Sequence, residues 1–114
     1  MKIVSLAALC AAWSLHPGNA NAGQSGIASV YSYSGGKTAS GERSHPGALT
    51  AAHRSLPIGS RARVTNRHNG RTVVVRINDR GPFIRGRIID VTPAAAHQLG
   101  FGGVTLVNVE RLGR

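Results

Sequence analysis

Apolar and polar residues alternate in several short runs along the chain, at residues 27–31, 61–66 and 71–78. A period of two places one set of side chains in a core and the other set in solvent, as in half-buried β-strands. Two further runs are rich in β-branched residues. The sequence therefore predicts five strands, at residues 27–31, 61–66, 71–78, 87–92 and 104–112.

Between the second and third of these runs lies a polar stretch that contains Asn69 and Gly70. An Asn-Gly pair favours the positive φ angles of tight hairpin turns, so we expect a β-hairpin here. Glycines also separate the other runs, which is the spacing that a small closed sheet requires.

One short helix is predicted after the fourth run. Thr92 can cap its start, Pro93 suits its first position, residues 94–99 have helix propensity, and Gly100 can end it.

The first 22 residues have the pattern of a secretory signal peptide. Lys2 supplies positive charge, residues 3–15 form a short apolar run, and Ala22 ends a small-residue cleavage site. This run is shorter than the roughly 20 apolar residues of a membrane-spanning helix. We therefore expect cleavage after Ala22, no stable membrane insertion, and a domain at residues 23–114 that works in the periplasm or outside the cell. Cys10 follows Leu9 rather than a small residue, so we expect no lipid attachment there.

The chain is strongly basic, with 14 Lys and Arg residues against four acids. Such a surface attracts polyanions. Export removes most nucleic acid from reach and leaves acidic envelope polymers or anionic lipid headgroups as partners. A basic surface that serves only solubility is an equal alternative. The short domain supports a single core, and we expect a monomer.

Because acids are scarce, their positions carry information. Glu42, Asp79 and Asp90 each lie beside a turn or at a strand end, where a carboxyl is held rigidly yet is reachable by a substrate. Asp79 precedes a Gly-Pro turn and could instead accept hydrogen bonds from neighbouring backbone amides. Asp90 follows two isoleucines and could pair with an arginine.

His53 ends a small apolar run and could bond a carboxyl or a loop carbonyl. The histidines have no zinc-type spacing, and no cysteine follows Cys10, so we expect neither a metal nor a cofactor. No serine lies in a strained Gly-flanked elbow.

Five segments, taken in order, closely resemble the rare lipoprotein A family. They run in sequence over almost the whole domain, from residue 26 to residue 112, and together are specific. The segments are GIASVY at 26–31, TASGE at 38–42, LTAAH at 49–53, LPIG at 56–59 and NDRGPF at 78–83.

The resemblance implies an all-β fold, a six-stranded double-psi β-barrel with one short helix, as in barwin and expansin domains. It also implies a lytic transglycosylase of peptidoglycan, which cleaves the bond between N-acetylmuramic acid and N-acetylglucosamine and leaves 1,6-anhydro ends during cell-wall remodelling. Asp79 matches the acid of the family's Asn-Asp-Arg-Gly-Pro motif, and Glu42 and His53 match its other active-site positions. We expect four further residues to bind the glycan: Tyr31, Asn78, Arg80 and Asp90.

One carboxyl can serve as acid and then as base in this reaction, and Asp79 is the expected one. Glu42 could raise the proton affinity of Asp79 as a neighbouring like charge. Val30 stands where relatives often have tryptophan, which removes a platform for a sugar ring. The alternative is therefore a non-catalytic, expansin-like module that binds cell-wall glycan, and a basic secreted protein that binds an acidic surface is a third possibility.

Overall fold

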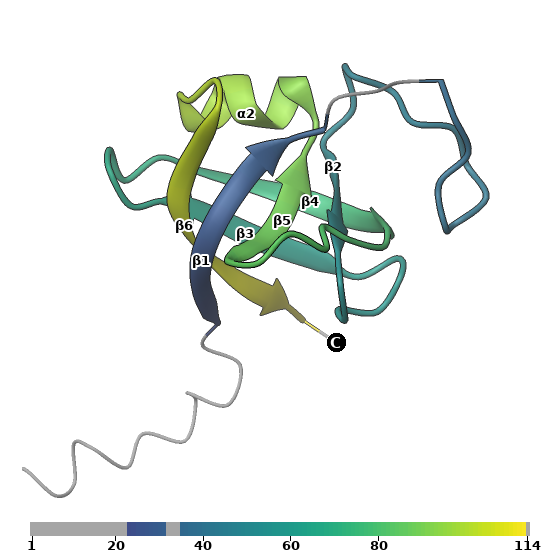
Figure 1. Cartoon of the computed structure of the whole chain (residues 1–114), viewed down its shortest axis with the longest axis horizontal. Coiled ribbons are helices and arrows are strands. Elements are labelled where there is room, and N and C mark those ends of the chain that lie inside the picture. Colours follow the sequence, from purple (N-terminus) through teal and green to yellow (C-terminus); the bar gives the residue numbers. More distant parts are fainter. Residues whose placement is uncertain (1–22, 32–34, 114) are drawn as a thin grey trace, which may run out of the picture.

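The computed structural model describes residues 23–31 and 35–113, so the expected signal peptide and its cleavage site lie outside the described residues. Six strands and one helix follow one another along the described part of the chain (Figure 1). The elements are β1 (Gln24–Val30), β2 (Thr50–His53), β3 (Arg61–Asn66), β4 (Thr72–Asp79), β5 (Arg87–Val91), α2 (Pro93–Leu99) and β6 (Val104–Leu112).

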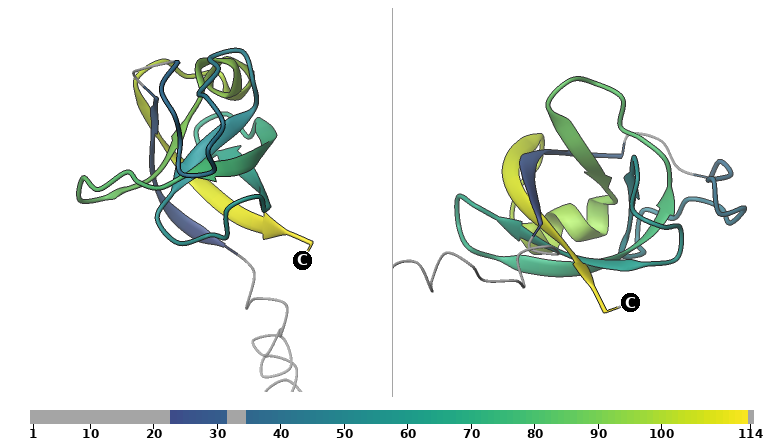
Figure 2. Two further views of the ribbon diagram at one scale, coloured as in Figure 1. Left: turned by 90° about the vertical axis from the view of Figure 1, so that its right-hand side faces the viewer. Right: turned by 90° about the horizontal axis from the view of Figure 1, so that it is seen from below.

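The six strands close into a barrel in the order β1-β5-β2-β4-β3-β6, and β6 pairs with β1 to complete the ring. Two neighbouring pairs are parallel, β1 with β5 and β2 with β4, and the other pairs are antiparallel. In Figure 2 (right) the strands encircle the interior, and α2 covers one end of it. This is the double-psi β-barrel that the resemblance implied.

The predicted strands are all present, and 61–66 and 104–112 have the expected bounds. The helix is also as predicted: the Thr92 side chain accepts a bond from the Ala95 amide, and Gly100 adopts the left-handed conformation at φ 81°. The strand that the pattern did not predict is β2. Its four residues are all buried, so it shows no alternation.

The predicted hairpin joins β3 to β4, but its turn is longer than a two-residue Asn-Gly turn. Only glycines have positive φ among the described residues, so Gly70 adopts it at 79° and Asn69 does not. The Gly70 amide donates to the Asn66 carbonyl over 2.7 Å, and the Asn66 amide donates to the Arg71 carbonyl over 2.8 Å.

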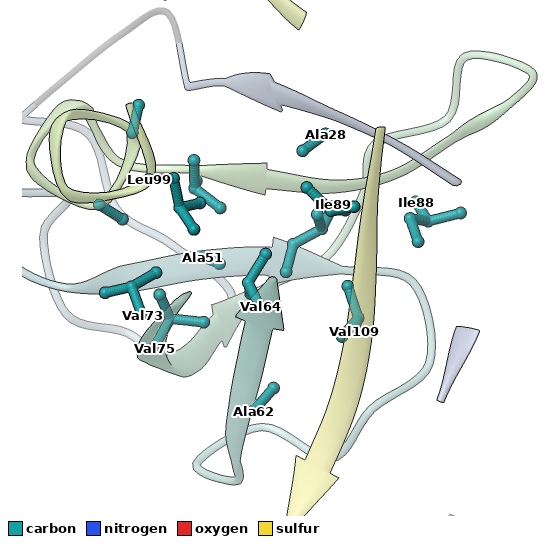
Figure 3. Packing of buried hydrophobic residues seen from close by; sticks show 14 of the residues in the cluster. Ala28, Ala51, Ala62, Val64, Val73, Val75, Ile88, Ile89, Leu99 and Val109 are labelled. Carbon is teal, nitrogen blue, oxygen red and sulfur yellow. The ribbon is translucent and has the colours of Figure 1, made fainter. Parts of the chain in front are cut away.

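Small and branched apolar side chains from all six strands and from α2 fill the interior (Figure 3). Ile77, Ile89 and Leu99 are fully buried. The packing is tight where β1 crosses β5, because a Cβ atom at Gly26 would lie 2.6 Å from Cγ2 of Ile88. A glycine is therefore required at this position.

One buried polar side chain ties three elements together. The Asn66 amide nitrogen donates to the Leu99 carbonyl at the end of α2 over 2.9 Å. Its oxygen accepts bonds from the His68 amide at 2.9 Å and from the Thr105 hydroxyl at 3.2 Å. Because its amide both donates and accepts, Asn66 is stable in a place that otherwise holds apolar groups.

Candidate functional site

A β-bulge in β4 turns Asp79 away from the core. In the pairing of β2 with β4, Ala51 lies opposite Ile77 and Ala52 lies opposite Asp79, so Asn78 is an extra residue. Strict alternation from the buried Ile77 would direct Asp79 into the barrel. The extra residue reverses this phase, as bulges do beside active sites, and Asp79 is half-buried rather than enclosed.

The Asp79 carboxyl accepts hydrogen bonds from three segments of the chain. The Tyr31 hydroxyl donates to Oδ2. The backbone amides of Ala39 and Arg80 donate to Oδ1, each over 2.9 Å. The Arg80 bond is the local turn contact that we considered for this aspartate, whereas the other two donors are remote in sequence. Asp79 is therefore both a turn residue and a fixed, partly exposed acid.

Glu42 is brought to the same end of β4 by a short folded-back segment, residues 35–44. The Thr38 amide donates to the Glu42 carbonyl over 2.9 Å, which closes the segment on itself. The Ser40 amide donates to the Asn78 carbonyl over 3.0 Å, which docks the segment on β4. Because Ala39 also bonds Asp79, one segment contacts both neighbouring residues of the bulge.

Glu42 forms a two-pronged ion pair with Arg76. Nη1 of Arg76 lies 2.6 Å from Oε1, and Nη2 lies 3.1 Å from Oε2. The Asn78 side-chain amide adds a third bond to Oε1 over 3.2 Å. The hydrogen bonds from Arg76, above all, lower the pKa of Glu42 to about 2. Glu42 is therefore ionised at neutral pH and cannot supply a proton there.

The sequence did not single out Arg76. Its place in the alternating 71–78 run marks it only as an outward-facing residue, and many arginines in this chain share that property. Its positive charge offsets part of the negative charge of Glu42, which weakens the expected like-charge effect of Glu42 on Asp79.

His53 is almost fully buried, with 3% of its surface exposed, and both ring nitrogens are bonded. Nδ1 accepts from the amides of Ser55 and Leu56, each over 3.1 Å, so the proton lies on Nε2, which donates to Oε1 of Gln24 over 2.9 Å. Burial, and next the positive charges of Arg54 and Arg80, lower the pKa of His53. These ring bonds, within the described residues, reach neither Glu42 nor Asp79.

Arg80 is directed towards the same loop. Its Nη1 atom donates to the Leu56 carbonyl over 2.7 Å and to the His53 carbonyl over 3.1 Å. Two side chains thus hold the start of the β2–β3 loop. Arg80 donates to backbone carbonyls there, and the His53 ring accepts from backbone amides.

Asp90 lies two strands away from Asp79. In the sheet register Asp90 pairs with Ala52, and Ala52 pairs with Asp79, so the small Ala52 separates the two acids. The Ser29 hydroxyl donates to Oδ1 of Asp90. The arginine partner that we considered for Asp90 is not observed: the ion pairs of the described chain are Arg76 with Glu42 and Arg63 with Glu110.

No group of three or more His, Cys, Asp or Glu side chains in residues 23–31 and 35–113 is arranged to hold a metal ion. Within the same residues, no helix has the length and apolar character to cross a membrane.

The closed barrel with two parallel strand pairs places this protein among the double-psi β-barrels. Residues 23–111 match the model of a family described as lytic transglycolase, and the chain belongs to this family. This agrees with the resemblance to the rare lipoprotein A family. In fold it is similar to the Streptomyces papain inhibitor, with a TM-score of 0.57 and 23% identity over 79% of this chain and 97% of that one.

Curated relatives share about half of the aligned residues or more. The probable endolytic peptidoglycan transglycosylase RlpA of Nostoc sp. is 60% identical over 78% of this chain and 26% of its own length. The endolytic peptidoglycan transglycosylases RlpA of Neisseria meningitidis serogroup A and Escherichia coli are 53% and 49% identical, over 78% and 76% of this chain. The chain spans only 39% and 25% of these two relatives.

Proposed function

We propose that this protein is a lytic transglycosylase that cleaves the bond between N-acetylmuramic acid and N-acetylglucosamine in peptidoglycan. The observation that carries the proposal is Asp79, a partly exposed acid that a bulge turns out of the core and three separate donors hold in place. The family match and the names of the relatives supply the substrate class.

The reaction needs a proton donor while the glycosidic bond breaks and a proton acceptor afterwards. One carboxyl can do both in turn. Asp79 first donates a proton to the glycosidic oxygen as the bond from C1 of the muramic residue to that oxygen breaks. The Asp79 carboxylate then takes the proton of the muramic 6-hydroxyl, and that oxygen bonds to C1 to close the 1,6-anhydro ring. Asp79 returns to its starting state without consuming water. General acid and base steps of this kind contribute about 10²- to 10⁴-fold in rate.

Glu42 has a different task because its pKa is about 2. It stays negatively charged and stabilises the positive charge that develops on the sugar ring as the bond breaks. Asn78 and Arg76 fix the direction of its carboxylate.

The other expected site residues divide into two groups. Asp90, two strands from Asp79, is proposed to bind the glycan, whereas the buried Asn78 is proposed to act through its bond to Glu42 and Tyr31 through its bond to Asp79. Arg80 and His53 are proposed to shape the β2–β3 loop, which borders the site. A catalytic role for His53 stays a prediction, and its hydrogen bonds favour a positioning role.

We also propose that residues 1–22 export the chain and that residues 23–114 act as a monomeric domain on the wall, in the periplasm or outside the cell. The excess of Lys and Arg suits a wall rich in acidic groups.

The identity of the product ends tests the reaction. The protein is incubated with peptidoglycan sacculi and with strands stripped of stem peptides, and the soluble fragments are analysed by mass spectrometry. A lytic transglycosylase releases 1,6-anhydro-muramic ends. Reducing ends would indicate a hydrolase instead. Binding to sacculi without release of fragments would support the alternative of a non-catalytic glycan-binding module.

A further inference from the structure

The loop that joins β4 to β5 carries an exposed aromatic ring. Phe83 has 77% of its surface exposed, more than the other exposed large apolar residues of the described chain. This loop projects from the barrel wall, as the green loop on the left of the left-hand view in Figure 2 shows. An aromatic side chain placed in this way offers a flat apolar surface to a ligand.

The ring lies against the backbone beside the proposed acid. A Cβ atom built at Gly81 would be in ordinary van der Waals contact with the ring, 3.4 Å from Cε2 and 3.6 Å from Cδ2 of Phe83, so the ring lies beside Gly81. Gly81 is two residues from Asp79, and two trans peptide units span at most about 7.6 Å between Cα atoms. The residue that the ring contacts is thus a near neighbour of the proposed acid along the chain.

The loop holds its shape through backbone hydrogen bonds. The Arg87 amide donates to the Ile84 carbonyl over 3.0 Å, and the Ile27 amide donates to the Gly86 carbonyl over 3.1 Å. A ring presented on such a held loop loses little conformational freedom when a ligand binds, which favours affinity.

The other described aromatic residues are engaged elsewhere. The Tyr31 hydroxyl is bonded to Asp79. Phe101 is partly buried and packs against the core. Val30, where a tryptophan platform is often found in the resembling family, offers no ring. Among these positions Phe83 is the aromatic residue that is mostly exposed, whereas Tyr31 and Phe101 are half-buried.

We propose that Phe83 is the stacking platform for a sugar ring of the glycan strand next to the cleaved bond. The C–H groups on one face of a pyranose ring carry slight positive charge and are apolar, so they pack on the electron-rich face of an aromatic ring. The inference rests on the proposed function, because that function supplies the glycan as the ligand.

The test measures glycan binding without turnover. The protein is purified as the cell exports it, in an Asp79→Asn background, and is titrated with glycan strands that lack stem peptides. Phe83→Ala is expected to raise the Kd about three- to tenfold. Phe83→Tyr, which keeps the ring, and Ile84→Ala, which removes the neighbouring exposed apolar side chain, are expected to keep the Kd within about twofold.

A fluorescent variant gives a second readout. Trp13 is the only tryptophan of the chain. The proposed cleavage after Ala22 removes Trp13, so Phe83→Trp in the exported protein places a single tryptophan on the loop, and its emission is expected to shift when the stripped strands bind. Because Phe83 is mostly exposed, we expect these variants to fold, and circular dichroism checks this.

An unchanged Kd for Phe83→Ala would overturn the inference. So would an equal loss in Ile84→Ala, since that result would indicate a general apolar contact of the loop, such as contact with lipid. If the unaltered protein neither binds nor cleaves glycan, the proposed function fails and the platform fails with it. If it cleaves glycan and Phe83→Ala leaves binding and KM unchanged, only the platform fails.

Discussion

The Tyr31 hydroxyl donates a hydrogen bond to Oδ2 of Asp79, a residue that lies 48 positions further along the chain. The Tyr31 amide is itself bonded to the Val91 carbonyl at the end of β5 over 2.8 Å. Tyr31 therefore connects the end of one parallel strand pair to the acid at the end of the other. A phenol can both donate and accept, so this contact can persist when Asp79 gains and loses its proton.

Tyr31→Phe separates this contact from any stacking role of the ring. The variant keeps the ring and removes the hydroxyl, so we expect kcat to fall about ten- to a hundredfold, since a hydrogen bond to a charged group contributes about 1.5–3 kcal/mol. KM should change little. Steady-state rates of fragment release check this. A variant with normal kcat would show that the hydroxyl is dispensable to the acid.

The ion pair with Arg76 controls the charge of Glu42. In Arg76→Ala the main cause of the low pKa is removed, so the pKa of Glu42 should rise from about 2 towards the ordinary glutamate value of 4.5. A titration of the Glu42 side-chain carboxyl by NMR between pH 1.5 and about 7 measures this directly. Glu42 would then be partly protonated at mildly acidic pH. The pH below which activity is lost should therefore rise.

Arg63→Ala is the matched control for this variant. Arg63 forms the other exposed ion pair of the described chain, with Glu110, over 3.1 Å. Its removal should leave the Glu42 titration where it is. Equal shifts in both variants would mean that overall positive charge, rather than the direct contact, holds the pKa of Glu42 down.

The alternating pattern was sufficient to predict most of the barrel, because most strands have one face in the core and one in solvent. It failed for β2, whose Thr50–His53 are buried on both faces. It also could not reveal the bulge at Asn78, since an extra residue leaves no mark in a run that already ends in polar residues.

The sequence drew attention to the acids of the candidate site, but not to the partners that the structure gives their side chains. Glu42 and Asp79 stood out because acids are rare in this chain. The partners Arg76 and Tyr31 come from strands far away in sequence, so their contacts depend on closure of the barrel. Arg80 was expected to bind the glycan, and in the structure its guanidinium donates to loop carbonyls.

Burial of neutral His53 makes stability depend on pH. Its folded pKa is lower than its unfolded value of about 6.5, so the unfolded chain binds the proton more readily. The contribution of neutral His53 to the free energy of unfolding is therefore complete above about pH 6.5. It is lost as the pH falls through the lower folded pKa. Urea unfolding between about pH 5 and 8 should show this loss, and His53→Asn should reduce it.

His97→Asn provides the comparison for this measurement, because His97 is exposed on α2. Its profile should follow that of the unaltered protein. If His53→Asn kept the full pH dependence, another group would be responsible and the buried neutral imidazole would not be the cause.

Asn66 should be important for stability rather than for catalysis. Asn66→Ala removes the partner of the His68 amide and of the Thr105 hydroxyl, and leaves the Leu99 carbonyl with the Asn69 side-chain amide as its donor. We expect a loss of about 2–3 kcal/mol and a fall in Tm of about 8–20 °C. Asn108→Ala, which removes an exposed asparagine, should change stability by less than about 0.5 kcal/mol. Thermal unfolding of the two variants compares them, and equal Tm values would refute the role of Asn66.

The most direct test compares Asp79→Asn with the unaltered protein in the release of 1,6-anhydro fragments from sacculi. Asparagine keeps the size of the side chain and removes its capacity to give and take a proton. We expect release to fall at least about 10²-fold, while the Tm and the binding to sacculi are retained. Undiminished release of anhydro fragments by a correctly folded Asp79→Asn protein would contradict the account.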